Sequence, residues 1–246
     1  LSRGYRPGGV NQHPKLAARN RPYRAETLWN AETGVHASAE RGAASLTLFH
    51  ARRHDQQVEL SSQQDPGDPN SFVLLTANAG AGWNAGAELE ANYRVARGLT
   101  LRSTAGWLVT HTDSYSFDNA QGERLTLGDR EAAHAPSYTT RIGLDYEHRT
   151  GLLARLTLSA TDGFYYSDSH NNEADAQHLL HGSVGYQTSA WSVSVWGRNL
   201  LDERYTTRGF AFVLEPPAYD EKLYVTHGDP RQIGVTWRAK VGGSGD

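Results

Sequence analysis

The chain of 246 residues contains no cysteine, and it has no long apolar run. Without cysteine it can hold neither a disulfide framework nor a thiolate metal site. No stretch reaches the roughly 18 consecutive apolar residues that a transmembrane helix needs, which excludes a helical membrane protein. The formal net charge of −3 is too small to suggest a nucleic-acid-binding protein.

Catalytic and cofactor motifs are also lacking: there is no G-x-S-x-G, no phosphate-cradling loop and no Cys-x-x-Cys. Gly80, Gly82 and Ala85 fit the spacing G-x-G-x-x-A, but an alternating strand follows where a dinucleotide site needs a helix. The sequence therefore predicts no enzyme and no cofactor.

A metal site is not predicted either. His50 and His54 would lie about 13 Å apart on a strand, too far to share one ion. The other histidines are expected in loops. One segment carries many charges, which we interpret as a solvated loop, although calcium or substrate contact stays open: Asp113, Asp118, Glu123, Arg124, Asp129, Arg130 and Glu131.

What the chain does have is strict alternation of apolar and polar residues. In "RQIGVTWRAKV" (231–241), Ile233, Val235 and Trp237 share one parity, and the other parity includes Gln232 and Arg238. Such a period of two predicts a strand with one apolar and one polar face. Segments 84–95, 141–148, 152–160 and 191–199 repeat the pattern. The segment "AELEANYRVA" contains good helix formers, but its alternation favours a strand.

The polar face of these strands carries full charges, which are costly in a dry core but tolerated in a polar lumen. Its long charged side chains are Glu88, Glu90, Arg94, Arg102, Arg141, Glu147, Arg155, Arg198, Arg238 and Lys240. This bulk suits a wide lumen better than a narrow tube.

Short turns alternate with long polar segments along the chain. The turns are expected at 41–42, 97–98, 150–151 and 189–190, and the long loops at 11–23, 62–71, 114–137, 167–176 and 215–230. This asymmetry is typical of outer-membrane barrels, in which short periplasmic turns oppose long extracellular loops. About ten strands are predicted, near 1–10, 26–40, 43–60, 76–96, 99–115, 138–149, 152–167, 177–188, 191–208 and 231–241.

Three separated motifs resemble the barrel domain of TonB-dependent outer-membrane receptors, which transport siderophores and vitamin B12. "GYRPGGVN" (4–11), followed by "RAETLWNAETG", is similar to the family's first motif. "NAGAGWNAGAELEANY" (78–93) is similar to N-x-G-x-a-x-x-x-G-x-E-x-E. "WGRNLLDERY" (196–205), leading to "GDPRQIGVTWRAKV" (228–241), resembles V-x-N-L-x-D-x-x-Y and the closing strand.

The resemblance implies an all-β fold: an antiparallel transmembrane barrel, with residues 1–241 forming the C-terminal part of a 22-stranded structure. Residues 242–246 would be a short C-terminal extension. It implies a multi-pass protein of the Gram-negative outer membrane, in contact with lipid. Because "LSRGYRPGG" resembles no signal peptide and the family carries a plug and a TonB box before the barrel, we expect the natural chain to begin further upstream.

The function that the resemblance implies is uptake of a scarce ligand, by default a ferric siderophore or similar iron chelate. The partners would be TonB, acting through the N-terminal part, together with the plug and the remaining barrel strands. One alternative is a self-contained small barrel, either an omptin-like protease or a pore. A soluble β-sandwich binding module is a third possibility.

Ligand contacts in this family lie at loop tips. The candidates here are Arg6, Gln12 and His13 in the first loop and Tyr219, Tyr224 and His227 in the last. Their guanidinium, amide, imidazole and phenol groups can bind an anionic or aromatic chelate. Ordinary hydrated loop residues are the alternative interpretation.

Two further expectations concern the strands of the predicted barrel. Aromatic residues at strand ends should form interfacial belts: Tyr93, Trp107, Tyr146, Trp191 and Trp237, with core packing as the alternative for Trp107. The first strand (1–10) and the last (231–241) should not pair with each other. Their partners would be strands outside this chain.

Overall fold

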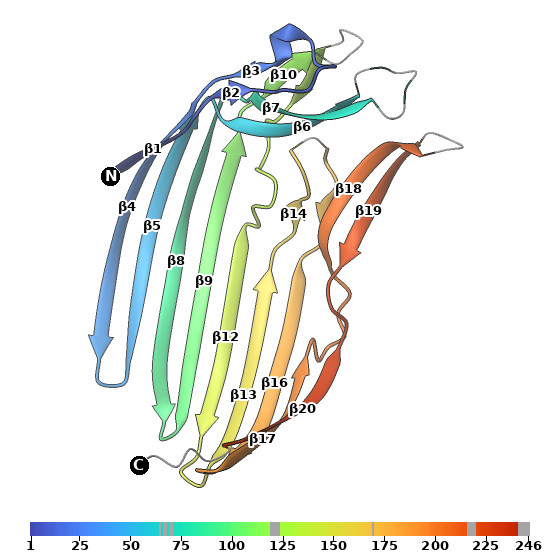
Figure 1. Ribbon diagram of the computed structural model, residues 1–246. Helices are drawn as coiled ribbons and strands as arrows, with labels where there is room; N and C mark the ends of the chain where they lie inside the picture. The colour runs from blue at the N-terminus through green and yellow to red at the C-terminus, as the bar shows by residue number, and fades with distance from the viewer. Residues whose placement is uncertain are drawn as a thin grey trace, which may run out of the picture.

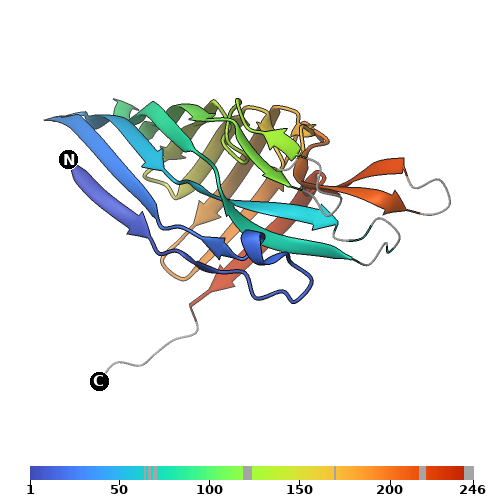
Figure 2. The ribbon, with the colours of Figure 1, turned by 90° about the horizontal axis from the view of Figure 1, so that it is seen from above.

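The computed structural model describes residues 1–63, 65, 68, 71–118, 124–168, 170–215 and 220–240. Its main feature is a curled, ten-stranded antiparallel sheet, here called the wall (Figures 1 and 2). In spatial order the wall strands are β1 (Ser2–Arg6), β4 (Glu26–Ala39), β5 (Gly42–His54), β8 (Ala81–Ala96), β9 (Leu99–Thr112), β12 (Tyr138–Glu147), β13 (Leu152–Thr161), β16 (Gln177–Gln187), β17 (Trp191–Arg198) and β20 (Gln232–Ala239). No helix in the described part of the chain is long and apolar enough to cross a membrane.

Short turns join the wall strands at one end, and long connections join them at the other (Figure 1). The turns occupy 40–41, 97–98, 148–151 and 188–190, so the predicted asymmetry is confirmed. The first turn is one residue earlier than predicted, because Gly42 already pairs with Ala39 in the ladder. Gly98 and Gly151 have φ values of +78° and +99°, a region that glycine enters without steric cost.

The long connections contain more structure than the sequence predicted. They form five two-stranded hairpins: β2 (Gly9–Val10) with β3 (Pro22–Tyr23), β6 (Gln57–Gln63) with β7 (Phe72–Asn78), β10 (Tyr115–Asp118) with β11 (Arg124–Leu127), β14 (Phe164–Tyr165) with β15 (Glu173–Ala174), and β18 (Thr206–Glu215) with β19 (Asp220–His227). A 3-10 turn, η1 (Ala18–Asn20), precedes β3. The prediction that 114–137 and 215–230 are plain loops was therefore wrong.

Several predicted strands are also shorter than expected. The predicted strand 43–60 breaks after His54, where Asp55 has a φ of +53° and cannot continue the ladder. The predicted strand 191–208 breaks after Arg198, where Asn199 and Asp202 have positive φ values. These breaks separate the wall from the hairpins above it.

The apolar face of the wall is exposed. Val235 is 68% exposed and Leu156 47%, although both lie in the middle of ordered strands. One row of cross-strand partners on this face runs through Leu99, Tyr146, Ala154, Val184, Val195 and Val235. An apolar band of this size on a monomer marks a contact surface rather than a solvated one.

Buried apolar side chains gather in the connections rather than in the wall. Within the described residues, one cluster joins the first connection to β6, β7 and β10: Leu16, Val58, Leu60, Val73, Leu75, Ala79 and Tyr115. We call this group the loop cap. It lies over the end of the wall opposite the short turns (Figure 1).

The edges of the wall do not meet. Within the described residues β1 pairs with β4 alone and β20 with β17 alone, so the first and last strands do not pair with each other. This confirms the expectation for residues 1–10 and 231–241. It also removes the sealed ten-stranded barrel that the small-barrel alternative required.

Four of the five aromatic residues expected in interfacial belts lie near one end of their wall strands, whereas Trp107 lies inside β9. These four residues are within a few positions of the short turns: Tyr93, Tyr146, Trp191 and Trp237. Tyr146 is partly buried, and the other three are exposed. Trp107, higher on β9, is 51% exposed, so core packing does not explain it. The expected C-terminal extension, residues 242–246, lies outside the described residues.

Candidate functional site

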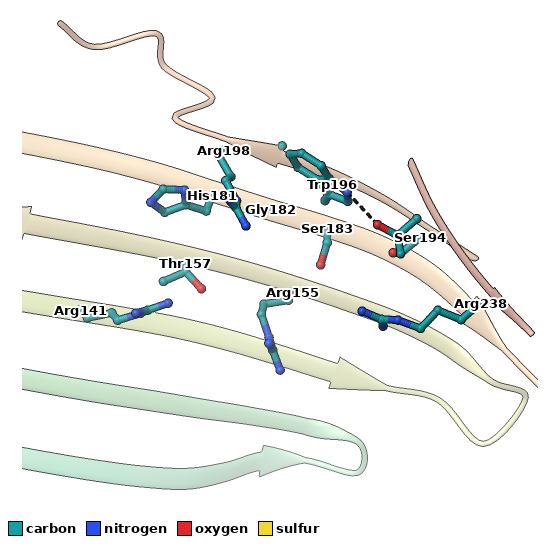
Figure 3. A pocket seen from close by; sticks show the side chains of 12 residues that line it. Arg141, Arg155, Thr157, His181, Gly182, Ser183, Ser194, Trp196, Arg198 and Arg238 are labelled. Atoms are coloured by element: carbon teal, nitrogen blue, oxygen red, sulfur yellow. Dashed lines mark hydrogen bonds between the residues drawn. The ribbon is translucent and has the colours of Figure 1, made fainter. Parts of the chain in front are cut away.

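The polar face of the wall carries a group of arginines on its C-terminal strands. Alternation places Arg141 on β12, Arg155 on β13, Arg198 on β17 and Arg238 on β20, opposite the apolar band. Together with His181 on β16 they line a recess of about 590 Å³ (Figure 3). We call this group the basic wall.

One carboxylate neutralises part of this charge. Asp145 accepts a hydrogen bond at Oδ1 from Nε of Arg155, at 2.5 Å, and another at Oδ2 from Nε of Arg102, at 2.8 Å. Two guanidiniums thus share one carboxylate, which leaves an excess of positive charge.

The remaining arginines of the basic wall lack anionic partners. Among the described residues Arg141, Arg198 and Arg238 form no ion pair, whereas Arg155 pairs with Asp145. The guanidinium of Arg198 lies 5.3 Å from the ring centroid of Trp196, a cation–π distance. The basic wall therefore presents unneutralised guanidiniums to the polar side of the sheet.

Trp196 is an apolar ring set into this polar face. Its Nε1 donates a hydrogen bond to Oγ1 of Thr236, at 3.0 Å (Figure 3). A Cβ at Gly234 would lie 2.3 Å from the indole, so glycine is what allows the ring to lie flat on β20. The ring and the guanidinium of Arg198 form a small surface suited to a flat, charged ligand.

Sequence reasoning assigned no site role to Trp196 and His181. Trp196 has the same parity as Ser194 and Arg198, so alternation in the sequence already places its side chain on the polar face. The expectation that histidines other than His50 and His54 lie in loops was wrong for His181, which is paired with Thr157 inside the wall. A single histidine inside a strand forms no motif that would reveal a binding role from sequence.

Acidic side chains lie on the polar face as well. Glu88 and Glu90 on β8 lie in a second recess, which reaches across to Arg141. The polar face is thus mixed in charge around β8, β9 and β12, where Arg94 and Arg102 lie in one recess with Asp145 and Glu147, and it is basic towards β20.

The six predicted ligand-binding residues fall into separate places. Gln12 and His13 are exposed in the first connection, and Arg6 is exposed at the end of β1. Tyr224 and His227 lie on β19, which rises from the opposite edge of the wall (Figure 1). Tyr219 lies outside the described residues. Among the described residues, the two groups lie in different parts of the fold.

The asparagines of the three sequence motifs hold the connections in place. Asn11 donates to the carbonyl oxygens of Asn20, Arg21 and Thr76 and accepts from the Thr76 amide. Asn78 donates to the carbonyl oxygens of Arg24 and Asp55. These contacts are structural.

Asn199, the asparagine of the third motif, makes similar contacts and is only 2% exposed. It donates to the carbonyl oxygens of Glu203 and Asp229 and accepts from the Glu203 amide. The motif thus ties the strand break after β17 to the segment that leads into β20.

Metal-binding geometry is not found in the described part of the chain, which contains no group of three or more His, Asp or Glu side chains placed to hold an ion. At the end of β9, Nε2 of His111 lies 3.5 Å from Oδ1 of Asp113 and 3.8 Å from Oδ1 of Asp129.

The family model described as "TonB dependent receptor-like, beta-barrel" matches residues 1–200 of this chain. The chain belongs to that family. TonB-dependent receptors are receptors and transporters of the Gram-negative outer membrane rather than enzymes. Accordingly, the wall is part of an outer-membrane barrel, its apolar band faces lipid and its polar face is turned to the lumen.

Similar proteins share this architecture. The pesticin receptor of Yersinia pestis is 24% identical over 214 residues, 85% of this chain and 29% of the relative. The crystal structure of the ferric yersiniabactin uptake receptor FyuA from the same organism aligns with a TM-score of 0.72 at 21% identity, covering 97% of this chain and 34% of that one. The siderophore receptor PiuA from Acinetobacter baumannii aligns with a TM-score of 0.65 at 14% identity, over 90% of this chain and 29% of that one. The chain thus spans about a third of the length of these relatives.

Proposed function

We propose that the complete receptor takes up a scarce, anionic iron chelate of the ferric-siderophore class across the outer membrane. Energy would come from TonB, acting on a plug that the family carries before its barrel. The chain described here supplies about ten strands of the wall and part of the extracellular cap. Family membership and the siderophore receptors among the similar structures support this proposal.

The basic wall is the observation that supports an anionic ligand. Arg141, Arg198 and Arg238 project from a lumen-facing surface and form no ion pair within the described residues. Guanidinium groups bind carboxylates and other oxyanions through short, charge-assisted hydrogen bonds. An anionic chelate that passes along this face would meet these groups in sequence, with the ring of Trp196 beside them.

The first contacts would be made above the wall. Arg6, Gln12 and His13 on one side and Tyr219, Tyr224 and His227 on the other are the proposed capture residues. Arg6 lies on β1, whereas Tyr224 and His227 lie on β19, beside the opposite edge of the wall (Figure 1). The two groups would therefore contact different sides of a ligand or act in separate binding steps. Loops above a rigid wall are where such binding residues concentrate.

The test is uptake by an iron-starved strain that lacks the intact receptor and is complemented with variants of it. A panel of ferric chelates of different charge identifies the ligand by restored growth. The double variant Arg141→Gln/Arg198→Gln should then slow uptake of that labelled chelate several-fold. Arg41→Gln/Arg97→Gln, which removes the same charge from the short turns, should leave uptake unchanged.

Restored growth on neutral chelates alone would contradict the proposed ligand class. Equal uptake by both double variants would remove the basic wall from the pathway. A receptor that inserts normally but supports growth on no iron chelate would contradict iron uptake altogether.

A further inference from the structure

The outer face of the wall carries a row of alternating cationic and aromatic side chains near the loop cap. Cross-strand register places Arg3 opposite Trp29, Trp29 opposite Arg52, Arg52 opposite Trp83 and Trp83 opposite His111. The row crosses β1, β4, β5, β8 and β9 without interruption. We call it the Arg–Trp row.

The face that carries the row is the lipid-facing one. Arg52 has the parity of Leu46 and Leu48 on β5, which are 37% and 48% exposed members of the apolar band. Trp83 likewise shares the parity of Leu89 and Tyr93 on β8. The row is therefore a continuation of the lipid-contacting surface and not part of the lumen.

The height of the row matches the edge of the hydrocarbon layer. Arg52 follows Gly42, the first residue of β5, by ten positions. At about 3.3 Å per residue and a tilt of roughly 40°, that distance is about 25 Å along the membrane normal, the height of a barrel's apolar band. Tryptophan is most stable at this boundary, where its ring is half in lipid.

The two arginines of the row have no carboxylate partner. Among the described residues Arg3 and Arg52 form no ion pair, and the guanidinium carbon of Arg3 lies 5.4 Å from the centroid of the Trp29 ring. Both side chains are exposed. At the far end, His111 already lies near Asp113 and Asp129, so the unpaired positive charge belongs to Arg3 and Arg52.

We propose that the Arg–Trp row binds the phosphorylated headgroup of an outer-leaflet lipid. The guanidiniums of Arg3 and Arg52 bind phosphate oxygens, and the rings of Trp29 and Trp83, on either side of Arg52, hold the sugar or glycerol face of the headgroup. A charge-assisted bond of this kind is strong where water is partly excluded. The acyl chains then lie over the apolar residues below, such as Leu48 and Val109.

The test uses the intact receptor in detergent and native mass spectrometry of bound lipid. Bisphosphorylated lipid A is the probe, with its dephosphorylated form, zwitterionic phosphatidylethanolamine and inorganic phosphate compared at equal concentration. The wild-type receptor should retain the bisphosphorylated lipid at least tenfold better than the other three. Arg3→Gln/Arg52→Gln should abolish that preference.

The matched control is Arg41→Gln/Arg97→Gln, which removes two arginines from the opposite rim and should keep the preference. Arg3→Gln alone should lose part of it, and this single change guards against a folding defect in the double variant. Equal retention of phosphorylated and dephosphorylated lipid would overturn the proposal, since the row would then be an ordinary interfacial belt. Tight binding of inorganic phosphate alone, or an equal loss in the control, would overturn it too.

Discussion

The carboxylate of Asp145 on β12 accepts a hydrogen bond from the guanidinium of Arg155 on β13, with 2.5 Å between Oδ1 and Nε. Arg102 binds the other carboxylate oxygen. Asp145→Asn should lower the free energy of unfolding by roughly 0.5–1 kcal/mol, because both arginines are largely exposed and water screens the pairs. The loss should shrink in high salt.

Glu147→Gln is the matched control for that variant, since it removes a carboxylate two residues along the same strand that has no ion pair within the described residues. The measurement is the temperature at which the intact receptor loses its folded mobility on gels. Equal shifts for the two variants would show that the Asp145 pairs contribute nothing specific.

The lipid-facing position of Leu156 gives a second prediction. Leu156→Arg should destabilise the inserted receptor by about 2–4 kcal/mol, because a guanidinium near the bilayer centre must be dehydrated or drawn away. Ser159→Arg, on the polar face of the same strand, should cost much less. Refolding into lipid vesicles over a urea series measures both. A neutral Leu156→Arg would mean that this face does not contact lipid.

Asn199 combines three hydrogen bonds, near-complete burial and a φ of +46°. Asn199→Ala should cost about 2–3 kcal/mol, because buried backbone groups lose partners and alanine disfavours that φ. The β18–β19 hairpin should then become more sensitive to protease in intact cells. Asn92→Ala, at an exposed wall position, is the control and should leave the hairpin resistant.

The wall could be predicted from sequence because its cause is local. A period of two, as in Ile233, Val235 and Trp237, fixes both the strand and its lipid-facing side. The loop cap could not be predicted, because Leu16, Leu60 and Tyr115 come from three distant segments and meet only in the folded chain.

For the site, the arginines of the basic wall were already assigned to the polar face by parity, but their pairing was not. Which arginine shares Asp145 depends on the register of β9, β12 and β13, and sequence alternation leaves register open.

Tyr115, in the loop cap, gives a prediction about pH. Burial, reinforced by the negative charge of Asp168, raises its pKa to about 12 from an ordinary value of 10.0. The folded state keeps the proton that the unfolded state has lost above pH 10. The contribution of protonated Tyr115 to the stability of the fold is therefore fully present below pH 10 and is lost as the pH rises towards 12.

Ultraviolet absorbance of phenolate measures this titration in the intact receptor. Tyr115→Phe should remove the last component to titrate and flatten the stability loss above pH 10. If the variant changes only the component that titrates with exposed tyrosines, Tyr115 is not buried in the cap.

The accessibility of spin labels along β20, in the receptor reconstituted in lipid, directly tests which face of the wall contacts lipid. Single cysteines replace Gln232, Ile233, Val235, Trp237 and Arg238, and each label is exposed to oxygen, which dissolves in lipid, and to a water-soluble nickel chelate. An apolar band in lipid and a polar face in the lumen predict a period of two, with oxygen contact at 233, 235 and 237 and nickel contact at 232 and 238. Equal accessibility on both parities, or nickel contact at 235, would contradict a wall with one face in lipid and the other in the lumen.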